Sequence, residues 1–236
     1  MGWYGFAPYV PIGEKREKAK KQLVKLSKKD PGVEPVIIEG SKIAKTWWGI
    51  AWCQNLESYA DYMNRIGRGR SYVKNGFVLD LKVEEGIIKG KVCGSGLYDI
   101  SIKIDPLSNE NKALVLKSIG CKIDSIEDLI SGNFPKEFGE IFLTQEKGLF
   151  PSPKEIHLSC SCPDWASMCK HVAAVLYGVG ARLDIDPMLF FKLRSIDVGE
   201  FIKKSIDEKM RNMMKNAGAK TDRVIEDADI SDLFGL

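Results

Sequence analysis

Apolar residues recur every three or four positions in the first third of the chain. The series is Trp48, Trp52, Leu56, Tyr59, Met63 and Ile66. This spacing places the side chains on one face of a helix, so it predicts one long helix over residues 46–66. Gly67 follows and can adopt the left-handed conformation that ends a helix. A second, lysine-rich helix is expected over residues 14–29, before the Asp-Pro-Gly sequence at 30–32.

The period then changes from helical to two residues. Apolar side chains alternate at Phe77, Leu79, Leu81 and Val83, which predicts a strand within residues 71–83. Two more strand-like runs, 87–94 and 97–105, follow after the short sequences EEG and GSG. Short glycine-containing connections favour antiparallel pairing. Such a sheet buries one face, and the tryptophan-rich helix is expected to cover it.

Weaker patterns flank these elements. Residues 34–40 form a short apolar run that is interpreted as a strand, and short helices are expected near 109–119 and 125–130. Two prolines and a glycine within residues 148–155 interrupt regular structure, so a boundary is expected there. A strand before Cys160 and a helix after Cys169 are expected beyond it.

Four side chains that bind metals lie within the twelve residues CSCPDWASMCKH. Cys160 and Cys162 follow a predicted strand, in which residues two apart point to the same side. Cys169 and His171 stand at the entrance of a predicted helix, which should begin at or just before His171. Three thiolates and one imidazole form a tetrahedral donor set for Zn²⁺. Because the protein would fill all four positions, we expect one structural zinc ion.

The same residues also allow other assignments. An iron–sulfur centre usually requires four cysteines, and a disulfide between Cys160 and Cys162 would be strained. His157, three residues before Cys160, is interpreted as an ordinary strand histidine rather than an alternative ligand or a second donor near the metal. The remaining cysteines are expected to be buried thiols: Cys53, Cys93 and Cys121.

The order C-x-C, spacer, C-x-H between a strand and a helix resembles the SWIM zinc finger. Residues 169–194 resemble the helix and following segment of bacterial and archaeal SWIM proteins. Residues 45–83 resemble the region upstream of the finger in a subgroup often encoded beside a Swi/Snf-type helicase-like ATPase. This resemblance implies binding to DNA or to proteins rather than a reaction, and it places the ligands at Cys160, Cys162, Cys169 and His171.

Charge is unevenly distributed, although the net charge is only +3. The candidate nucleic-acid-binding residues lie in one basic stretch where a helix is expected to lead into the sheet: Arg65, Arg68, Arg70, Tyr72 and Lys74. Arginines can grip phosphates with paired hydrogen bonds, and a tyrosine can stack on a base. A charged loop that only contacts solvent is the alternative. For the lysine-rich helix at 14–29, a solvated face is the expected interpretation.

Candidate partner contacts come from two other places. Asp164 and Trp165 lie between the two ligand pairs, where a small metal-bound loop offers little core to bury them. Leu233 and Phe234 follow an acidic stretch near residue 236 and could dock on a partner or fold back on their own domain. The tryptophans Trp47, Trp48 and Trp52 are expected to pack in the core rather than to stack on bases.

Catalytic patterns are missing from the sequence. It contains no phosphate-binding P-loop, no H-E-x-x-H and no G-x-S-x-G. We therefore expect a non-catalytic zinc-binding module that binds DNA or RNA, a helicase-like ATPase, or both. A pure protein–protein adaptor and an uncharacterised enzyme are the alternatives. No apolar run is long enough to span a membrane and no secretory signal is evident, so a cytoplasmic protein is expected.

These patterns together predict an α+β fold in three parts. An N-terminal α+β domain, a small antiparallel sheet packed with helices, is expected over residues 1–150. A zinc-stabilised strand–turn–helix should occupy residues 151–195, and a helical segment with an acidic tail residues 196–236.

Overall fold

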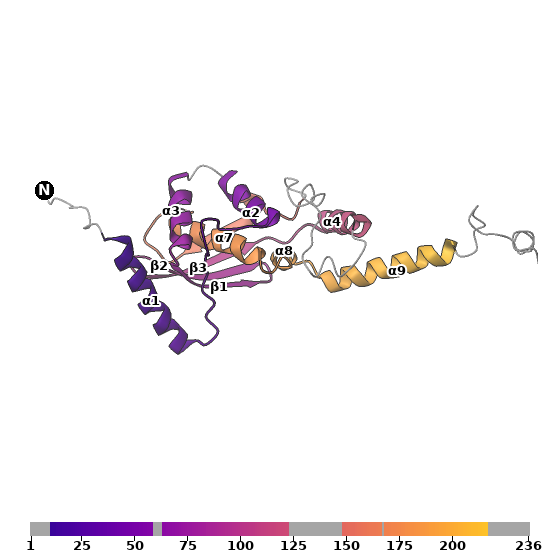
Figure 1. Cartoon of the computed structure of the whole chain (residues 1–236). Coiled ribbons are helices and arrows are strands. Elements are labelled where there is room, and N and C mark those ends of the chain that lie inside the picture. Colours follow the sequence, from indigo (N-terminus) through magenta and orange to yellow (C-terminus); the bar gives the residue numbers. More distant parts are fainter. Residues whose placement is uncertain (1–9, 59–62, 123–147, 167, 217–236) are drawn as a thin grey trace, which may run out of the picture. The chain divides into compact units, whose positions relative to one another are not determined.

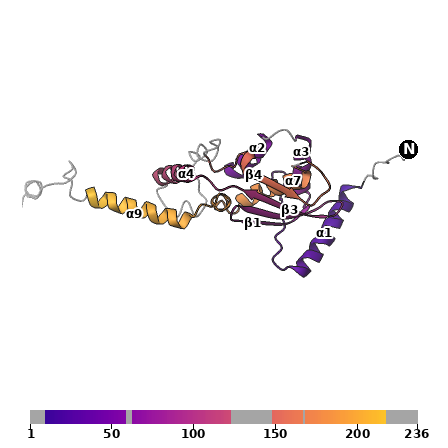
Figure 2. The ribbon, with the colours of Figure 1, turned by 180° about the vertical axis from the view of Figure 1, so that it is seen from behind.

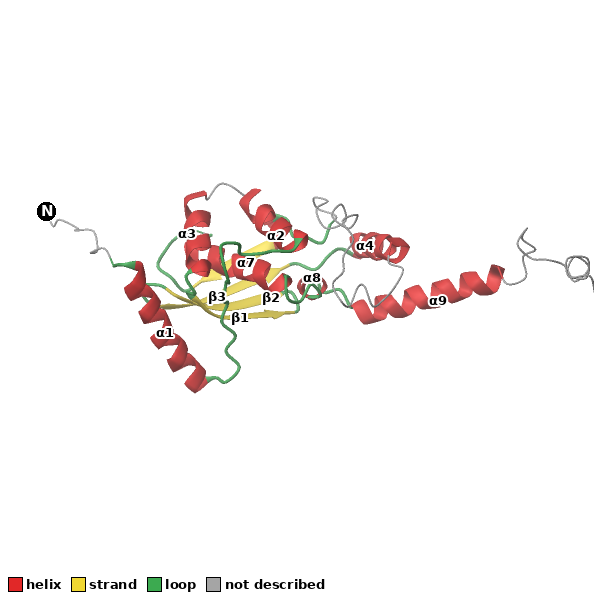
Figure 3. Cartoon of the chain, viewed as in Figure 1, coloured by secondary structure: helices red, strands yellow, loops and turns green. Residues whose placement is uncertain are grey.

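The computed structural model describes residues 10–58, 63–122, 148–166 and 168–216. The chain divides into two compact units, Met1–Asp197 and Val198–Leu236. The expected segments 1–150 and 151–195 both lie in the first unit. Figure 1 shows its helices and strands, and Figure 3 separates them by type.

The sheet has four antiparallel strands in the order β1-β2-β3-β4. Their bounds are Val78–Glu84 (β1), Ile87–Cys93 (β2), Leu97–Ile104 (β3) and Ile156–Cys160 (β4). The expected meander is therefore confirmed, and the strand that precedes the zinc ligands extends it. Ile104 pairs with Ile156, and Ile100 pairs with Cys160. The fourth strand thus brings the first cysteine ligand to the edge of the N-terminal sheet.

Helix α7 (Lys170–Leu183) lies across one face of this sheet (Figure 1). It is buried on nearly all sides, because α2 (Trp47–Ser58) and α3 (Met63–Lys74) pack against its other side. Gly90 of β2 permits this close approach, since a Cβ there would lie 2.8 Å from a methyl group of Val175. The mixed α+β fold class is confirmed.

The single helix expected over 46–66 is wrong, because α2 ends at Ser58 and α3 begins at Met63. Gly67 lies inside α3 rather than ending a helix. The apolar face was nevertheless identified correctly at Trp52. This side chain is 1% exposed, and its Nε1 donates a hydrogen bond to the carbonyl of Leu176 at 2.9 Å. The expectation of core packing is confirmed for Trp52, whereas Trp47 and Trp48 are half-buried.

The run at 34–40 is also not a strand. It is an irregular segment that follows the outer edge of β1, where the amide of Val36 donates to the carbonyl of Val78 and the amide of Leu81 donates to the carbonyl of Glu34. Its backbone therefore covers part of the sheet edge without forming a regular ladder. The helix expected near 125–130 lies outside the described residues.

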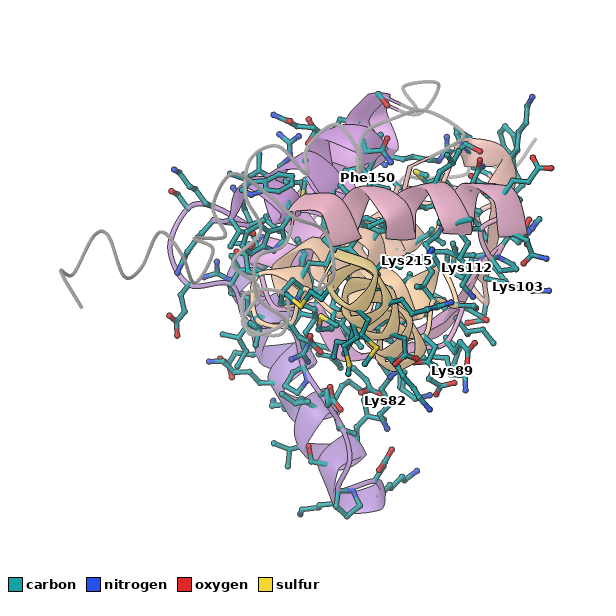
Figure 4. All side chains as sticks on the ribbon, turned by 90° about the vertical axis from the view of Figure 1, so that its right-hand side faces the viewer. Lys82, Lys89, Lys103, Lys112, Phe150 and Lys215 are labelled. Carbon is teal, nitrogen blue, oxygen red and sulfur yellow. The ribbon has the colours of Figure 1, made fainter. Side chains whose placement is uncertain are left out.

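Three shorter elements and the first helix complete the described part of this unit. They are α1 (Ile12–Lys29), α4 (Asn109–Lys122), the 3₁₀ turn η2 (Pro153–Glu155) and α8 (Leu189–Leu193). Seen from behind, the strands lie in front of α7 and α1 lies at one end of the sheet (Figure 2). On this side, the exposed residues Asp99, Ser101 and Lys103 alternate with buried neighbours along β3. The side chain of Lys103 points outward in Figure 4.

The second unit contains helix α9 (Val198–Asn216), which has exposed apolar side chains. These are Ile206, Met210, Met213 and Met214. Leu233 and Phe234 lie outside the described residues. Within the described ranges, no helix is both long and apolar enough to cross a membrane.

Candidate metal centre

The four predicted ligands converge at one end of the sheet. One ligand atom from each of Cys160, Cys162, Cys169 and His171 lies within 4.8 Å of all the others. Nδ1 of His171 is 3.9 Å from Sγ of Cys160 and 3.8 Å from Sγ of Cys169. A tetrahedral zinc ion with sulfur ligands at about 2.3 Å separates two sulfurs by roughly 3.8 Å, so the cluster has the right size. The cluster can therefore hold one zinc ion.

Local structure sets the spacing of the first pair. Cys160 ends β4, and Ser161 bridges to β3 through two hydrogen bonds with Asp99. The Ser161 amide donates to the Asp99 carbonyl at 3.0 Å, and the Asp99 amide donates to Oγ of Ser161 at 2.9 Å. These bonds fix the residue between the two cysteines against the sheet, so that Cys160 and Cys162 can face a common point.

The second pair stands at the start of α7. Cys169 is the N-cap residue, with extended backbone angles, and the first helical residue is Lys170. The prediction that the helix begins just before His171 is therefore confirmed. The helix N-terminus also places its partial positive charge beside the thiolates, which favours their ionised form.

Burial favours the uncharged form of three of these donors, Cys160, Cys169 and His171. It raises the pKa of the Cys160 and Cys169 thiols, since a buried thiolate without a counter-charge loses its hydration. Burial, with a smaller contribution from Lys170, lowers the pKa of His171 to about 4. The imidazole is therefore neutral near pH 7 and can donate a lone pair. A bound Zn²⁺ would supply the positive charge that the buried sulfurs need.

The imidazole of His171 packs against two aromatic rings. Its ring centroid lies 4.6 Å from that of Tyr98 and 5.5 Å from that of Tyr72. Gly94, in the turn after β2, leaves room for the ring, because a Cβ there would lie 2.8 Å from Nε2. Nε2 is buried without a hydrogen-bond partner in the described part of the chain, whereas Nδ1 faces the sulfurs. This orientation identifies Nδ1 as the metal-binding nitrogen.

Among the described residues, the second histidine and the other cysteines take no part in this cluster. Nε2 of His157 lies 2.9 Å from the Asp105 carboxylate on the exposed side of β4, which agrees with an ordinary strand histidine. Cys93 is buried as predicted, and Cys53 is half-buried. Burial, together with nearby Glu57, raises the pKa of Cys53 to about 12, so this thiol is not a reactive one. The side chain of Cys121 lies outside the described residues.

The five basic-stretch candidates belong to helix α3, not to a loop, and they separate into different roles. Arg70 is bound by Glu57 and by the hydroxyl of Tyr177, and it joins α3 to α2 and α7. Tyr72 is half-buried against His171 and Phe77, so it supports the metal ligand rather than offering a free ring. Arg68 and Lys74 are exposed, and neither makes an ion pair within the described residues.

Arg65, a predicted nucleic-acid contact, forms an ion pair with Asp164, a predicted partner contact. Its guanidinium lies 3.0 Å from the Asp164 carboxylate, and this charge lowers the pKa of Asp164. Trp165 is 91% exposed, and the Arg65 guanidinium carbon lies 5.7 Å from the centre of its ring. The basic stretch and the loop between the ligand pairs thus form one surface.

Three further cations near the centre were not singled out from the sequence. Lys18 of α1 donates to the carbonyls of Gly94 and Ser95, beside the ring of His171. Arg16 donates to the side chain of Asn75 just after α3, and Nζ of Lys170 lies 5.9 Å from the ring centre of Tyr72. We call Arg16, Lys18, Arg68 and Lys170 the basic rim. The high lysine content of residues 14–29 was the only sequence signal for its α1 members.

Comparison with known proteins supports the metal-binding pattern. A family model described as "SWIM zinc finger" matches residues 146–179, which include all four ligands. The chain is 35% identical over 155 residues to the "Uncharacterized protein Rv2102" of Mycobacterium tuberculosis (strain ATCC 25618 / H37Rv). That alignment covers 64% of this chain and 56% of the relative, so the chain matches little more than half of the relative's length. No solved structure matches the chain.

Proposed function

We propose that this protein is a non-catalytic nucleic-acid-binding module whose zinc ion holds the binding surface together. The observation that carries the proposal is the basic rim around the metal centre. Its cations come from three helices that are distant in sequence, α1, α3 and α7. Cations clustered on one face are the usual electrostatic footprint of a phosphate-backbone binder.

Packed side chains connect the metal ligands to several cations of the basic rim. The ring of His171 packs against that of Tyr72, and the Lys170 ammonium group lies over the Tyr72 ring. Gly94 lies beside His171, and its carbonyl accepts a hydrogen bond from Lys18. Loss of zinc would therefore displace several cations at once. A closed four-ligand site leaves no coordination position for substrate, which favours a structural role over catalysis.

We further propose that the module works in the cytoplasm beside a helicase-like, DNA-acting ATPase. The support is the similarity of residues 45–83 to the subgroup often encoded next to such enzymes. The second candidate is a pure protein adaptor. It is favoured by α9, where exposed methionines and Ile206 line an amphipathic helix of the kind that docks in partner grooves.

Salt-dependent binding tests the main proposal. Zinc-loaded protein should bind labelled DNA or RNA in fluorescence anisotropy, with affinity that falls steeply as salt rises, because phosphate contacts release counterions. Arg68→Glu should weaken binding about tenfold and reduce the salt slope. Lys103→Glu, the same charge reversal on the open face of the sheet, is the matched control and should change affinity little.

Two controls keep this experiment interpretable. Zinc content and melting temperature should be equal in both variants, because Arg68 and Lys103 are exposed. Absence of binding by the wild-type protein to single- or double-stranded nucleic acid at low salt would overturn the proposal. The adaptor function would then be the better explanation of the SWIM finger.

A further inference from the structure

Trp165 is the most exposed of the large apolar side chains in the described residues, at 91%. It is also unlike the other tryptophans of that part of the chain. Trp52 is buried, and the Nε1 atoms of Trp48 and Trp52 donate hydrogen bonds to carbonyls of α7. A tryptophan left in water exposes a large apolar surface, so its position calls for a binding role.

The loop that carries Trp165 is held on both sides. Cys162 and Cys169 enclose it, and both supply ligand atoms to the metal cluster. Ala166 is buried, and its amide donates to the carboxylate of Asp164 at 3.2 Å. The ring is therefore presented on a short loop that lies between two residues of the metal cluster and contains its own hydrogen bond.

Arg65 supports the ring directly. Its guanidinium lies over the indole and is fixed there by the ion pair with Asp164. One face of the indole is thus in contact with a cation, while the high exposure of the side chain leaves the rest of the ring accessible. Fixing the ring in advance reduces the ordering cost of binding a second flat group.

We infer that Trp165, held by Arg65, stacks on an unpaired base, so that the protein binds single-stranded nucleic acid in preference to duplex. This inference rests on the proposed function and specifies its ligand. Arg68 lies one turn after Arg65 on the same helix, and Lys170 follows the ligand Cys169. A flat apolar anchor beside cations is complementary to a chain of flat bases linked by phosphates. In a duplex the base faces are already stacked on one another, so the indole has no base face to contact.

The test uses the full-length, zinc-loaded protein and two labelled oligonucleotides. One is an unstructured single strand of about 15 nucleotides, within the usual site size for such proteins. The other is a hairpin duplex of similar composition. Trp165→Ala should weaken binding of the single strand about tenfold or more and leave duplex binding nearly unchanged. Trp165→Phe keeps a stacking ring and should retain most of the affinity.

Two further readouts separate stacking from charge. The salt slope of Trp165→Ala should equal that of the wild type, whereas Arg68→Glu should reduce it. Tryptophan fluorescence should be quenched when the single strand binds, and Trp165→Phe should lose that quenching. Zinc content and melting temperature should match the wild type, because the substituted ring is exposed.

The outcomes distinguish this inference from the proposed function. If the wild type binds and Trp165→Ala binds the single strand equally well, base stacking is wrong and the nucleic-acid function stands. An equal loss of affinity for single strand and duplex would also overturn the stacking inference. If the wild type binds neither oligonucleotide, both proposals fail. Loss of a co-purifying protein from Trp165→Ala, with nucleic-acid binding unchanged, would assign the ring to a protein contact instead.

Discussion

Gly69 of α3 lies directly against Ala173 of α7. A Cβ at position 69 would be 2.5 Å from the Cβ of Ala173 and 2.9 Å from its backbone carbonyl carbon. Helix α3 carries Arg65 and Arg68, while α7 begins beside the metal ligands. This glycine therefore sets the distance between the basic side chains and the zinc centre.

Substitution of Gly69 should destabilise the protein despite alanine's better helix propensity. Gly69→Ala should lower the free energy of unfolding by about 1–3 kcal/mol, because the obstructing atoms include backbone of a buried helix. Gly67→Ala in the same helix is the matched control, since nothing lies within 4 Å of its added Cβ. That control should be neutral or stabilising by about 0.5–1 kcal/mol. Urea unfolding compares the two, and equal stability would show that α3 and α7 are not packed this closely.

Removal of zinc should destabilise both the ligand-bearing segment 160–171 and the edge strand β4. Purified protein should contain about one zinc per chain, as a closed site with three cysteines and one histidine requires. Cys162→Ser should lower the zinc content and the melting temperature, because metal binding contributes directly to folding. Cys53→Ser alters a cysteine outside the cluster and should keep the metal. Elemental analysis checks both, and wild-type protein without zinc after expression in zinc-supplied medium would contradict the assignment.

The ion pair between Glu155 and Arg194 predicts a pH dependence of stability. Arg194 is almost fully buried and lies 2.6 Å from the Glu155 carboxylate. Burial of Glu155 opposes its ionisation, but hydrogen bonds from Ser152 and Arg194 prevail and lower its pKa. Because the pKa of Glu155 is lower in the folded protein, its carboxylate stabilises the fold at pH values above the unfolded pKa of about 4.3. This stabilisation is lost as the pH falls through the folded pKa.

Glu155→Gln isolates that contribution. The variant should be about 2 kcal/mol less stable than the wild type at pH 7, since a buried guanidinium loses its counter-charge. The difference should shrink as pH is lowered through the acid range. Zinc loss at low pH affects both proteins, so the measured quantity is the difference between their unfolding free energies. Glu14→Gln, on exposed α1, should show no such trend.

Asp184 should be important for the start of α2, although 138 positions separate it from Thr46. Its carboxylate accepts hydrogen bonds from the amides of Lys45 and Thr46 and from the Thr46 hydroxyl. Asp184→Ala should cost about 1–2 kcal/mol, the usual range for loss of a helix cap. Glu85→Ala, in the exposed turn after β1, should stay within about 0.5 kcal/mol of the wild type. Thermal unfolding of the two variants decides whether this cap stabilises α2.

The metal ligands were predictable because their chemistry is local. Four donors in twelve residues, with a strand before and a helix after, define the site without any long-range information. The sheet meander was predictable for a similar reason, since alternating strands are joined by turns as short as Glu85 and Gly86. Gly86 has φ = 64°, which is the conformation expected of a glycine in such a turn.

The division of the first helical pattern could not be predicted from periodicity. Ile66 is buried and continues the apolar spacing of α2, although it belongs to α3. Gly67 reads as a stop signal in sequence but is simply an exposed position within α3. What makes α3 a helix is its packing on α7, and that contact depends on residues about a hundred positions away.

The grouping of the candidate contact residues failed for the same physical reason. Arg65 and Asp164 are 99 positions apart, so the sequence assigned one to nucleic acid and the other to a partner. Tyr72 looked available for stacking, yet its ring supports His171. Lys18 reaches the metal centre only because α1 lies beside the turn that contains Gly94.

The pairing of β3 with β4 also bears on the order in which the protein folds. The first two hairpins join neighbouring segments, whereas Asp105 and His157 meet across 52 positions of chain. Closing a long loop is entropically costly and slow relative to hairpin formation, so β4 should join the sheet late. The four ligands lie within one short segment and need no such closure to approach one another. We therefore expect a nascent chain to capture zinc first and to add the metal-bound segment to the finished hairpins afterwards.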